Sequence, residues 1–212
     1  MAKKTITPPF ASLKDAVKDY QLYLLDVLLL ELHICKRALD PMFGFNNDEI
    51  AEIFLSGGHQ RRIPKKDLIT ELAKHPSLWT YNYPNFDALY EAVKSTMGPV
   101  LHFGDLTIYD VAKRIGYARG LHPEYVYLCS NTVRKSARTL LGLRRTKEKL
   151  PPADFAKLSG LEPLNAMEVE NFLCVFSDYI VLGGIDPSCT AGFSDVRYRN
   201  HYSPAILAKL GL

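Results

Sequence analysis

The sequence predicts an all-α fold, and three observations support this prediction. Apolar residues recur at steps of three and four along most of the chain, which is the spacing of one helix face. Residues that favour helix starts and helix ends bound these periodic stretches. One short stretch, 125–129, has a β-like composition, and a single isolated strand builds no sheet. We therefore expect one multi-helix globular domain over residues 1–212, an arrangement compatible with two helical lobes around a cleft.

The expected boundaries of the individual helices follow from these start and end signals. The first begins at the capping-box-like Ser12-Leu13-Lys14-Asp15 and ends at Asp40-Pro41, and its apolar middle predicts a central buried helix. Glycine and proline bound further helices at about 48–55, 65–74, 86–97, 107–119 and 132–141. A long apolar helix is expected from Asn165-Ala166-Met167-Glu168 to about Leu182, before Gly183-Gly184, and a short terminal helix from Ser203.

Composition and motifs exclude several classes of protein. The chain is 47% hydrophobic and 23% charged, as expected of a soluble globular protein. Its most apolar run, 22–34, is interrupted by Asp26 and Glu31, and the N-terminus lacks a continuous apolar segment, so we expect a cytoplasmic protein without a membrane partner. No P-loop, H-E-x-x-H or G-x-S-x-G pattern occurs, which argues against nucleotide hydrolases, zincins and serine hydrolases.

The cysteines are spaced too widely for a metal or redox motif. Cys35, Cys129, Cys174 and Cys189 stand 94, 45 and 15 residues apart and form no C-x-x-C pair. This spacing argues against a zinc ribbon, a redox pair and an iron–sulfur loop. We expect reduced and mostly buried thiols, no metal site and no cofactor.

Positive charge is concentrated in one segment. Residues 134–149 carry seven Lys and Arg against one acid, Glu148, a charge of +6 that leaves −3 for the rest of a chain whose net charge is +3. A second basic group, Arg61, Arg62, Lys65 and Lys66, follows Gly57-Gly58-His59-Gln60. Two basic stretches on a nearly neutral chain predict contact with a polyanion. The alternative is that both are ordinary solvated surfaces.

A short apolar turn precedes one of the expected helices. The stretch Val100-Leu101-His102-Phe103-Gly104-Asp105-Leu106-Thr107 has one glycine and leads directly into the helical pattern. We expect Gly104 to supply the positive φ of the turn and Thr107 to cap or enter the helix. Backbone N–H groups at such a helix start suit a phosphate. An ordinary corner between two core helices is the alternative.

Taken in order, these features resemble the helix-hairpin-helix DNA glycosylase superfamily, of the endonuclease III and adenine-glycosylase type. Phe103-Gly104-Asp105-Leu106-Thr107 is similar to the second half of the family's hairpin L-P-G-V-G-x-K-T, with His102 in place of the first glycine. Tyr127-Leu128-Cys129-Ser130-Asn131-Thr132-Val133 is similar to the apolar stretch and the catalytic turn V-D-T-H-V. The resemblance covers about 83–143 and implies a helix-hairpin-helix region at about 86–143, duplex DNA as partner, base flipping and base excision.

Two departures limit what the resemblance implies. Leu106 stands in place of the lysine that forms a Schiff base in strand-cleaving members, so lyase chemistry is not expected. Asn131 falls where the catalytic aspartate would lie, and an amide is no general base. The substitute carboxylates that we consider are Asp110 and Asp195 first and then Glu124, with Asn131 orienting the water or the base, although each acid is also an ordinary cap or surface residue.

The resemblance and the charge pattern also suggest binding residues. Contacts to DNA are expected from the hairpin and from the basic helix that follows: His102, Phe103, Gly104, Thr107, Arg134, Lys135 and Arg138. Aromatic residues of two loops, Trp79, Tyr81 and Tyr198, are candidates for stacking on an extruded base, and core packing is their alternative role.

The leading hypothesis is a monomeric, monofunctional DNA glycosylase. It would hydrolyse the N-glycosidic bond of a damaged or modified base with an activated water and without a cofactor. The sequence does not identify which base is removed. One alternative is a non-catalytic DNA-binding module of the same fold. The other is a helical protein–protein adaptor whose basic stretches are solvated surface.

Overall fold

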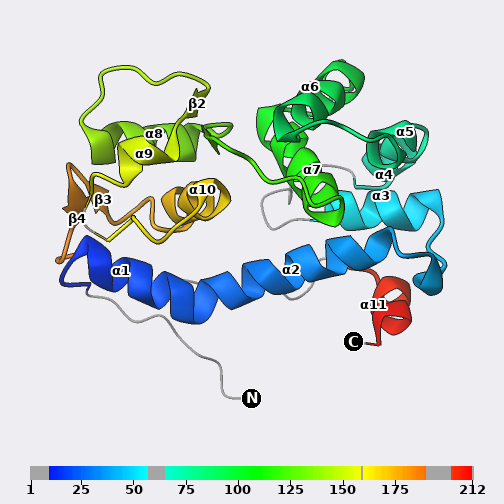
Figure 1. Ribbon diagram of the computed structural model, residues 1–212, viewed down its shortest axis with the longest axis horizontal. Helices are drawn as coiled ribbons and strands as arrows, with labels where there is room; N and C mark the ends of the chain where they lie inside the picture. The colour runs from blue at the N-terminus through cyan, green and yellow to red at the C-terminus, as the bar shows by residue number, and fades with distance from the viewer. Residues whose placement is uncertain (1–9, 57–64, 159, 190–201, 212) are drawn as a thin grey trace. The chain divides into compact units, whose positions relative to one another are not determined.

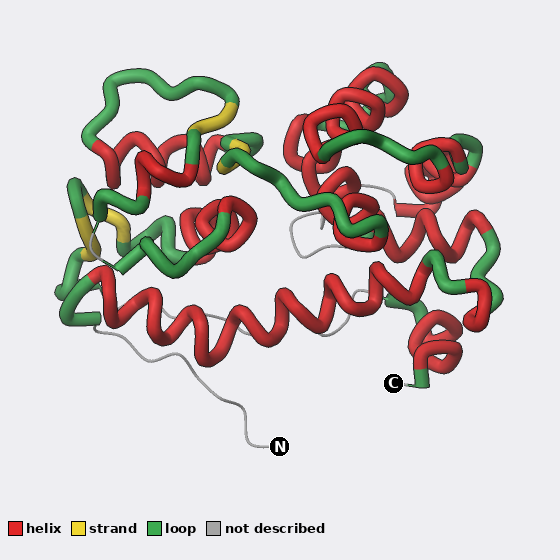
Figure 2. Tube along the Cα trace, in the orientation of Figure 1, coloured by secondary structure: helices red, strands yellow, loops and turns green. Residues whose placement is uncertain are grey.

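The computed structural model describes residues 10–56, 65–158, 160–189 and 202–211. Helices dominate this part of the chain, and the strands in it are short, so the all-α prediction is confirmed (Figures 1 and 2). The chain divides into two compact units. Unit 1 comprises Met1–Leu28 and Pro123–Asp195, and unit 2 comprises Leu29–His122 and Val196–Leu212.

Unit 1 is built around aromatic packing. Phe172 stacks on Phe176 at 4.4 Å between ring centroids, and Tyr20 meets Phe172 edge-on at 5.8 Å. Phe10 and Tyr179 complete this cluster of buried rings. Its elements are α1 (Leu13–Asp19), the π-helical turn η1 (Tyr20–Leu24), β1 (Val126–Tyr127), α8 (Asn131–Leu141), β2 (Lys149–Leu150), α9 (Pro152–Phe155), α10 (Ala166–Val175), β3 (Ile180–Val181) and β4 (Gly184–Ile185).

Unit 2 is organised around one helix, α7 (Asp105–Ala118), whose residues from Thr107 to Gly116 are all buried. Helix α6 (Phe86–Met97) packs against it, and the rings of Phe86 and Tyr109 meet edge-on at 6.2 Å. The remaining elements are α2 (Leu25–Ala38), which begins at the end of unit 1, η2 (Pro41–Phe43), α3 (Asn47–Leu55), α4 (Lys65–Ala73), α5 (Ser77–Thr80) and α11 (Pro204–Leu210).

The long first helix differs from the prediction in two ways. It is interrupted by the π-helical turn between α1 and α2. Leu22, Leu29 and Leu30 are about half exposed, so this helix is not buried all round. The centrally buried helix is α7, whose buried positions include charged residues that hydrophobic periodicity alone does not identify as core.

Two further expectations were wrong. The strand near 126 is not isolated, because Val126 pairs with Leu150 and Tyr127 with Lys149 in an antiparallel ladder. The predicted helix to Leu182 ends at Val175, and the following apolar residues form the hairpin β3–β4. Gly183, with φ of 70°, supplies the left-handed position that the hairpin turn needs. A two-residue strand is too short to show a periodic pattern, which is why neither ladder is visible in the sequence.

The predicted caps are present. Asn165 accepts from the Glu168 N–H at 3.0 Å, and the Glu168 carboxylate accepts from the Asn165 N–H at 2.9 Å. Ser203 caps α11 by accepting from the Ile206 N–H at 3.5 Å. These side chains satisfy backbone donors that a helix start leaves unpaired, which is why the local sequence marks them.

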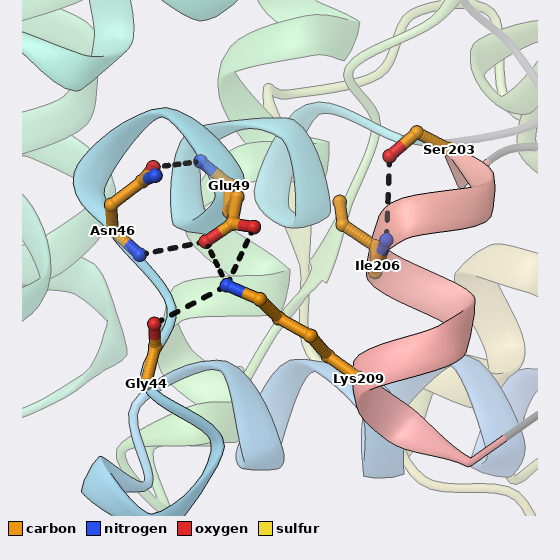
Figure 3. Close-up of polar contacts among 6 residues, drawn as sticks. All are labelled: Gly44, Asn46, Glu49, Ser203, Ile206 and Lys209. Atoms are coloured by element: carbon orange, nitrogen blue, oxygen red, sulfur yellow. Dashed lines mark hydrogen bonds and ion pairs between the residues drawn. The ribbon is translucent and has the colours of Figure 1, made fainter.

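Helix α11 is held on unit 2 by an ion pair with the start of α3 (Figure 3). Lys209 Nζ lies 2.7 Å from the Glu49 carboxylate and 3.3 Å from the Gly44 carbonyl oxygen. Glu49 also accepts from the Asn46 N–H at 2.9 Å as part of a capping box. One carboxylate thus supports both a helix start and the docking of the terminal helix.

This carboxylate makes the docking of α11 sensitive to acid. Partial burial alone would raise the pKa of Glu49, but the hydrogen bonds from Lys209 and from the Asn46 N–H outweigh it and lower the pKa. The resulting stability is present above the ordinary glutamate pKa of about 4.3 and is lost as pH falls through the lower folded-state value. We expect Lys209→Met to reduce the loss of unfolding free energy between about pH 5 and pH 3, measured by urea titration. The same pH dependence in both proteins would contradict this.

Candidate functional site

The candidate site lies on α8 in unit 1. Val133, Ser136, Ala137 and Leu140 are buried, at the spacing of one helix face, and Ser130 caps the helix by accepting from the Val133 N–H at 3.0 Å. The opposite face is exposed, and it includes Asn131, Lys135, Arg138 and Gly142 at steps of three and four residues. Burial of the apolar face therefore directs the cations outward.

A shallow hollow lies at the C-terminal end of α8. It has a volume of about 390 Å³ and is lined by Lys135, Arg138, Thr139, Gly142, Leu143, Arg144 and Leu182. Gly142 ends the helix in the left-handed region with φ of 66°, and the Leu143 N–H donates to the Arg138 carbonyl at 2.9 Å. This left-handed cap turns the chain at the end of α8, so residues beyond the helix also line the hollow.

The far wall of the hollow comes from the β3–β4 turn. The Gly183 N–H donates to the Leu140 carbonyl at 2.9 Å, which attaches the turn to the last turn of α8. A Cβ atom placed on Gly142 would lie 3.0 Å from Leu182 Cδ1, so the Leu182 side chain lies against this glycine. One hollow is thus formed by residues about forty positions apart in the chain.

The lining is basic. It contains Lys135, Arg138 and Arg144, and no acidic residue is among the lining residues of the described chain. Within the same described ranges, no ion pair engages any of these three side chains. A site of this composition attracts anions and offers several donors to phosphate oxygens.

Arg134 differs from its neighbours. Its Nε donates to the Leu128 carbonyl at 2.6 Å, and its side chain is partly buried. This bond connects the end of β1 to the first turn of α8. We therefore assign Arg134 a structural contact, while the predicted contact residues Lys135 and Arg138 lie on the exposed face together.

The predicted hairpin of unit 2 is a turn between α6 and α7; Thr107 enters the helix as expected, but the expectation that Gly104 supplies the positive φ was wrong. His102 has φ of 71° and is the left-handed residue of the turn, whereas Gly104 has φ of −79°. Gly104 is the N-cap of α7, and Thr107 is a buried residue inside the helix. Phe103 is also buried, so only His102 and Gly104 of the four predicted hairpin contacts are exposed.

The predicted catalytic residues lie in different environments. Asp110 is buried in α7, with one carboxylate oxygen 3.4 Å from Lys113 Nζ. Glu124 and Asn131 are exposed in unit 1, and Asp195 lies outside the described residues. Burial keeps Asp110 from direct contact with a ligand, so Glu124 is the accessible acid among the described candidates.

The predicted base-stacking residues do not form one described group. Trp79 is buried in unit 2, its ring 5.9 Å from that of Phe54. Tyr81 is 62% exposed and packs edge-on against Tyr83 at 5.0 Å. Tyr198 lies outside the described residues, as do Arg61 and Arg62 of the second basic group.

Of the seven residues that line the hollow, sequence reasoning named only Lys135 and Arg138 as site residues and missed the other five, among them Arg144 and Leu182. Arg144 belongs to the basic segment, and its position after the helix-ending Leu141-Gly142-Leu143 was the available signal. Leu182 was assigned to a helix, although Gly183-Gly184 directly after it also fits a hairpin turn.

The four cysteines are free thiols, as expected, although only Cys35 and Cys129 are buried. Burial raises the pKa of Cys35 to about 12, which makes this thiol a poor nucleophile. In the described ranges, no cluster of three His, Cys, Asp or Glu side chains is arranged to hold a metal ion. No helix there is long and apolar enough to cross a membrane. Comparisons with protein-family models, with curated proteins and with solved structures find no match to this chain.

Proposed function

We propose that this protein binds double-stranded DNA, and that the basic hollow of unit 1 contacts the sugar–phosphate backbone. The supporting observation is the group Lys135, Arg138 and Arg144 in one hollow at the end of an amphipathic helix. Cations without ion-pair partners release counterions from DNA when they contact phosphates, which drives binding without sequence preference. Phosphate contacts of this kind set the position of a protein on the duplex.

The salt dependence of binding tests this function. Fluorescence anisotropy with a labelled duplex, between about 50 and 200 mM salt, gives the slope of log K against log salt. We expect the triple variant Lys135→Gln, Arg138→Gln, Arg144→Gln to lower the magnitude of this slope by up to about 0.9 for each phosphate contact removed. Affinity at the higher salt concentration should fall together with the slope.

A charge-matched control separates the effect of the hollow on DNA binding from the effect of the protein's net charge. Lys14, Lys18 and Lys157 are exposed cations of unit 1, and changing all three to glutamine removes the same charge. This control should bind DNA more like the wild-type protein than like the first variant. Equal losses in both variants would exclude the hollow as the interface, and no salt-dependent binding by the wild-type protein would leave the adaptor alternative.

Base excision is the second candidate function, and the α6–α7 turn favours it. His102, at the position that the family hairpin gives to its first glycine, has the positive φ that glycine most readily adopts. Asn131, which the resemblance places where the catalytic aspartate would lie, is exposed at the start of α8, directly after the N-cap Ser130. An amide therefore stands at the acid's position, and the carboxylate must come from elsewhere.

A base-release assay decides between binding and excision. Duplexes carrying deaminated, oxidised or alkylated bases are incubated with the protein and then treated with alkali, which cleaves at abasic sites. Strand breaks only after alkali, with a loss of roughly 10²–10⁴-fold in Glu124→Gln, would support excision with Glu124 as the acid. No base release from any substrate leaves non-catalytic DNA binding as the function.

A further inference from the structure

One strongly exposed side chain that lines the basic hollow is apolar. Leu182 is 74% exposed at the tip of the β3–β4 turn, and its neighbours Val181 and Leu143 are 39% and 38% exposed. Leu182 and Leu143 line the hollow together with the three cations. Most of the Leu182 side chain is left outside the packing of unit 1, next to cations that form no ion pair within the described residues, which points to a binding role.

The turn that carries Leu182 is held firmly. Two-residue strands pair Ile180 with Ile185 and Val181 with Gly184, and the Asp186 N–H donates to the Tyr179 carbonyl at 2.7 Å. The Gly183 N–H bonds to α8, as described above. These bonds attach the turn to α8, so the backbone at Leu182 is held next to the helix that carries Lys135 and Arg138.

A group of cations beside an exposed apolar side chain is suited to insertion into a DNA duplex. Cations attract the phosphates on either side of a groove, and an apolar side chain between them can enter a base step and partly unstack it. Steps of pyrimidine followed by purine, such as TA, unstack most easily. Charge complementarity therefore favours DNA as the occupant of this surface.

We propose that Leu182 is an apolar wedge that inserts into a base step and kinks the bound duplex. The inference rests on the proposed DNA-binding function, and it adds the deformation of DNA and a preference for flexible steps. Leu182 would contribute to DNA binding through its apolar volume, and the cations through their charge. The two contributions are therefore separable by experiment.

The test uses the full chain and a duplex with a fluorescent adenine analogue in a central TA step. Emission of the analogue rises when it is unstacked, and end labels report bending by energy transfer. We expect the wild-type protein to raise the emission and to bend the duplex. Leu182→Ala should abolish most of the emission change and lower affinity about tenfold, the loss expected when one leucine side chain is no longer buried, while the salt slope stays unchanged.

Controls make each outcome decisive. Leu30→Ala removes another exposed leucine, on α2, and should behave like the wild-type protein. Leu182→Gln keeps the side-chain volume without its apolar character and should lose the emission change, and thermal unfolding checks that both Leu182 variants are folded. If the duplex is bound with the expected salt slope but without unstacking, or if Leu182→Ala unstacks it normally, the wedge is excluded and DNA binding stands.

Two further outcomes are informative. If no duplex is bound at any salt concentration, the proposed function itself fails, which the salt titration shows independently of any Leu182 variant. If the protein instead binds vesicles of anionic lipid, and Leu182→Ala abolishes that binding, the apolar tip inserts into lipid and the DNA wedge is overturned.

Discussion

Replacement of Arg114 by methionine is expected to lower the free energy of unfolding by about 3–5 kcal/mol. Arg114 is 2% exposed in α7 and donates from Nε and Nη2 to Glu31 at 2.9 and 2.6 Å. Its Nη1 donates to the Phe54 carbonyl at 3.1 Å. Burial alone would lower the pKa of Arg114, but Glu31 and Asp110 raise it, so the guanidinium stays charged. Without it, Glu31 is left as a mostly buried carboxylate that has lost its partner.

A double-variant cycle tests whether the instability comes from the unpaired Glu31 carboxylate or from a general packing defect. Arg114→Met with Glu31→Leu removes both charges, and we expect it to be more stable than Arg114→Met alone, as measured by urea titration. Lys74→Met breaks an exposed ion pair with Glu71 and should change stability little. If the double variant is as unstable as the sum of the single variants, the unpaired carboxylate is not the cause.

Gly116→Ala is expected to destabilise the protein by about 1–3 kcal/mol, although alanine is the better helix former by about 1 kcal/mol. A Cβ atom at Gly116 would lie 2.8 Å from the Leu121 carbonyl oxygen and 3.0 Å from a ring carbon of Phe86. The carbonyl is backbone and is held in place, because the Leu121 N–H donates to the Gly116 carbonyl at 2.7 Å. Movement of Phe86 would disturb the α6–α7 contact, and movement of the Leu121 carbonyl would disturb the hydrogen bond that ends α7.

Gly104→Ala is the matched control for this prediction. Gly104 has φ of −79°, and no atom lies within 4 Å of a Cβ added there. We expect its midpoint of thermal unfolding to stay close to that of the wild-type protein, whereas Gly116→Ala should unfold at a clearly lower temperature. A stabilised Gly116→Ala variant would mean that the close packing around α7 is not rigid.

Local patterns predicted most of the helices because the signals for a helix start, a helix end and a helix face each span only a few residues. The helix 86–97 matches α6, and the expected start of α8 differs by one residue. Asn85, Ser130 and Asn165 cap helices through bonds to residues three positions on, which the sequence displays directly. Lys135 and Arg138 were predicted as contact residues from the basic segment, and their spacing of three residues within α8 places them on one exposed face.

The features that the sequence did not predict depend on contacts between distant residues. The β1–β2 ladder pairs residues more than twenty positions apart, and Leu182 reaches the hollow through the bond from Gly183 to Leu140. Arg134 donates a hydrogen bond to the Leu128 carbonyl, and this contact depends on where the fold places Leu128. Asp110 is buried because α7 is surrounded by its neighbours, and one helix's own sequence does not contain that information.

The sequence alone therefore determined the all-α class, most helix positions with their caps, and the concentration of positive charge near α8, because these follow from short-range backbone and side-chain preferences. The tertiary structure decided which cations line one hollow, that an apolar turn joins them, and that α7 rather than the first helix is the buried centre of its unit. These outcomes depend on how side chains from separate segments fill a common space, and packing of that kind is decided by the whole fold.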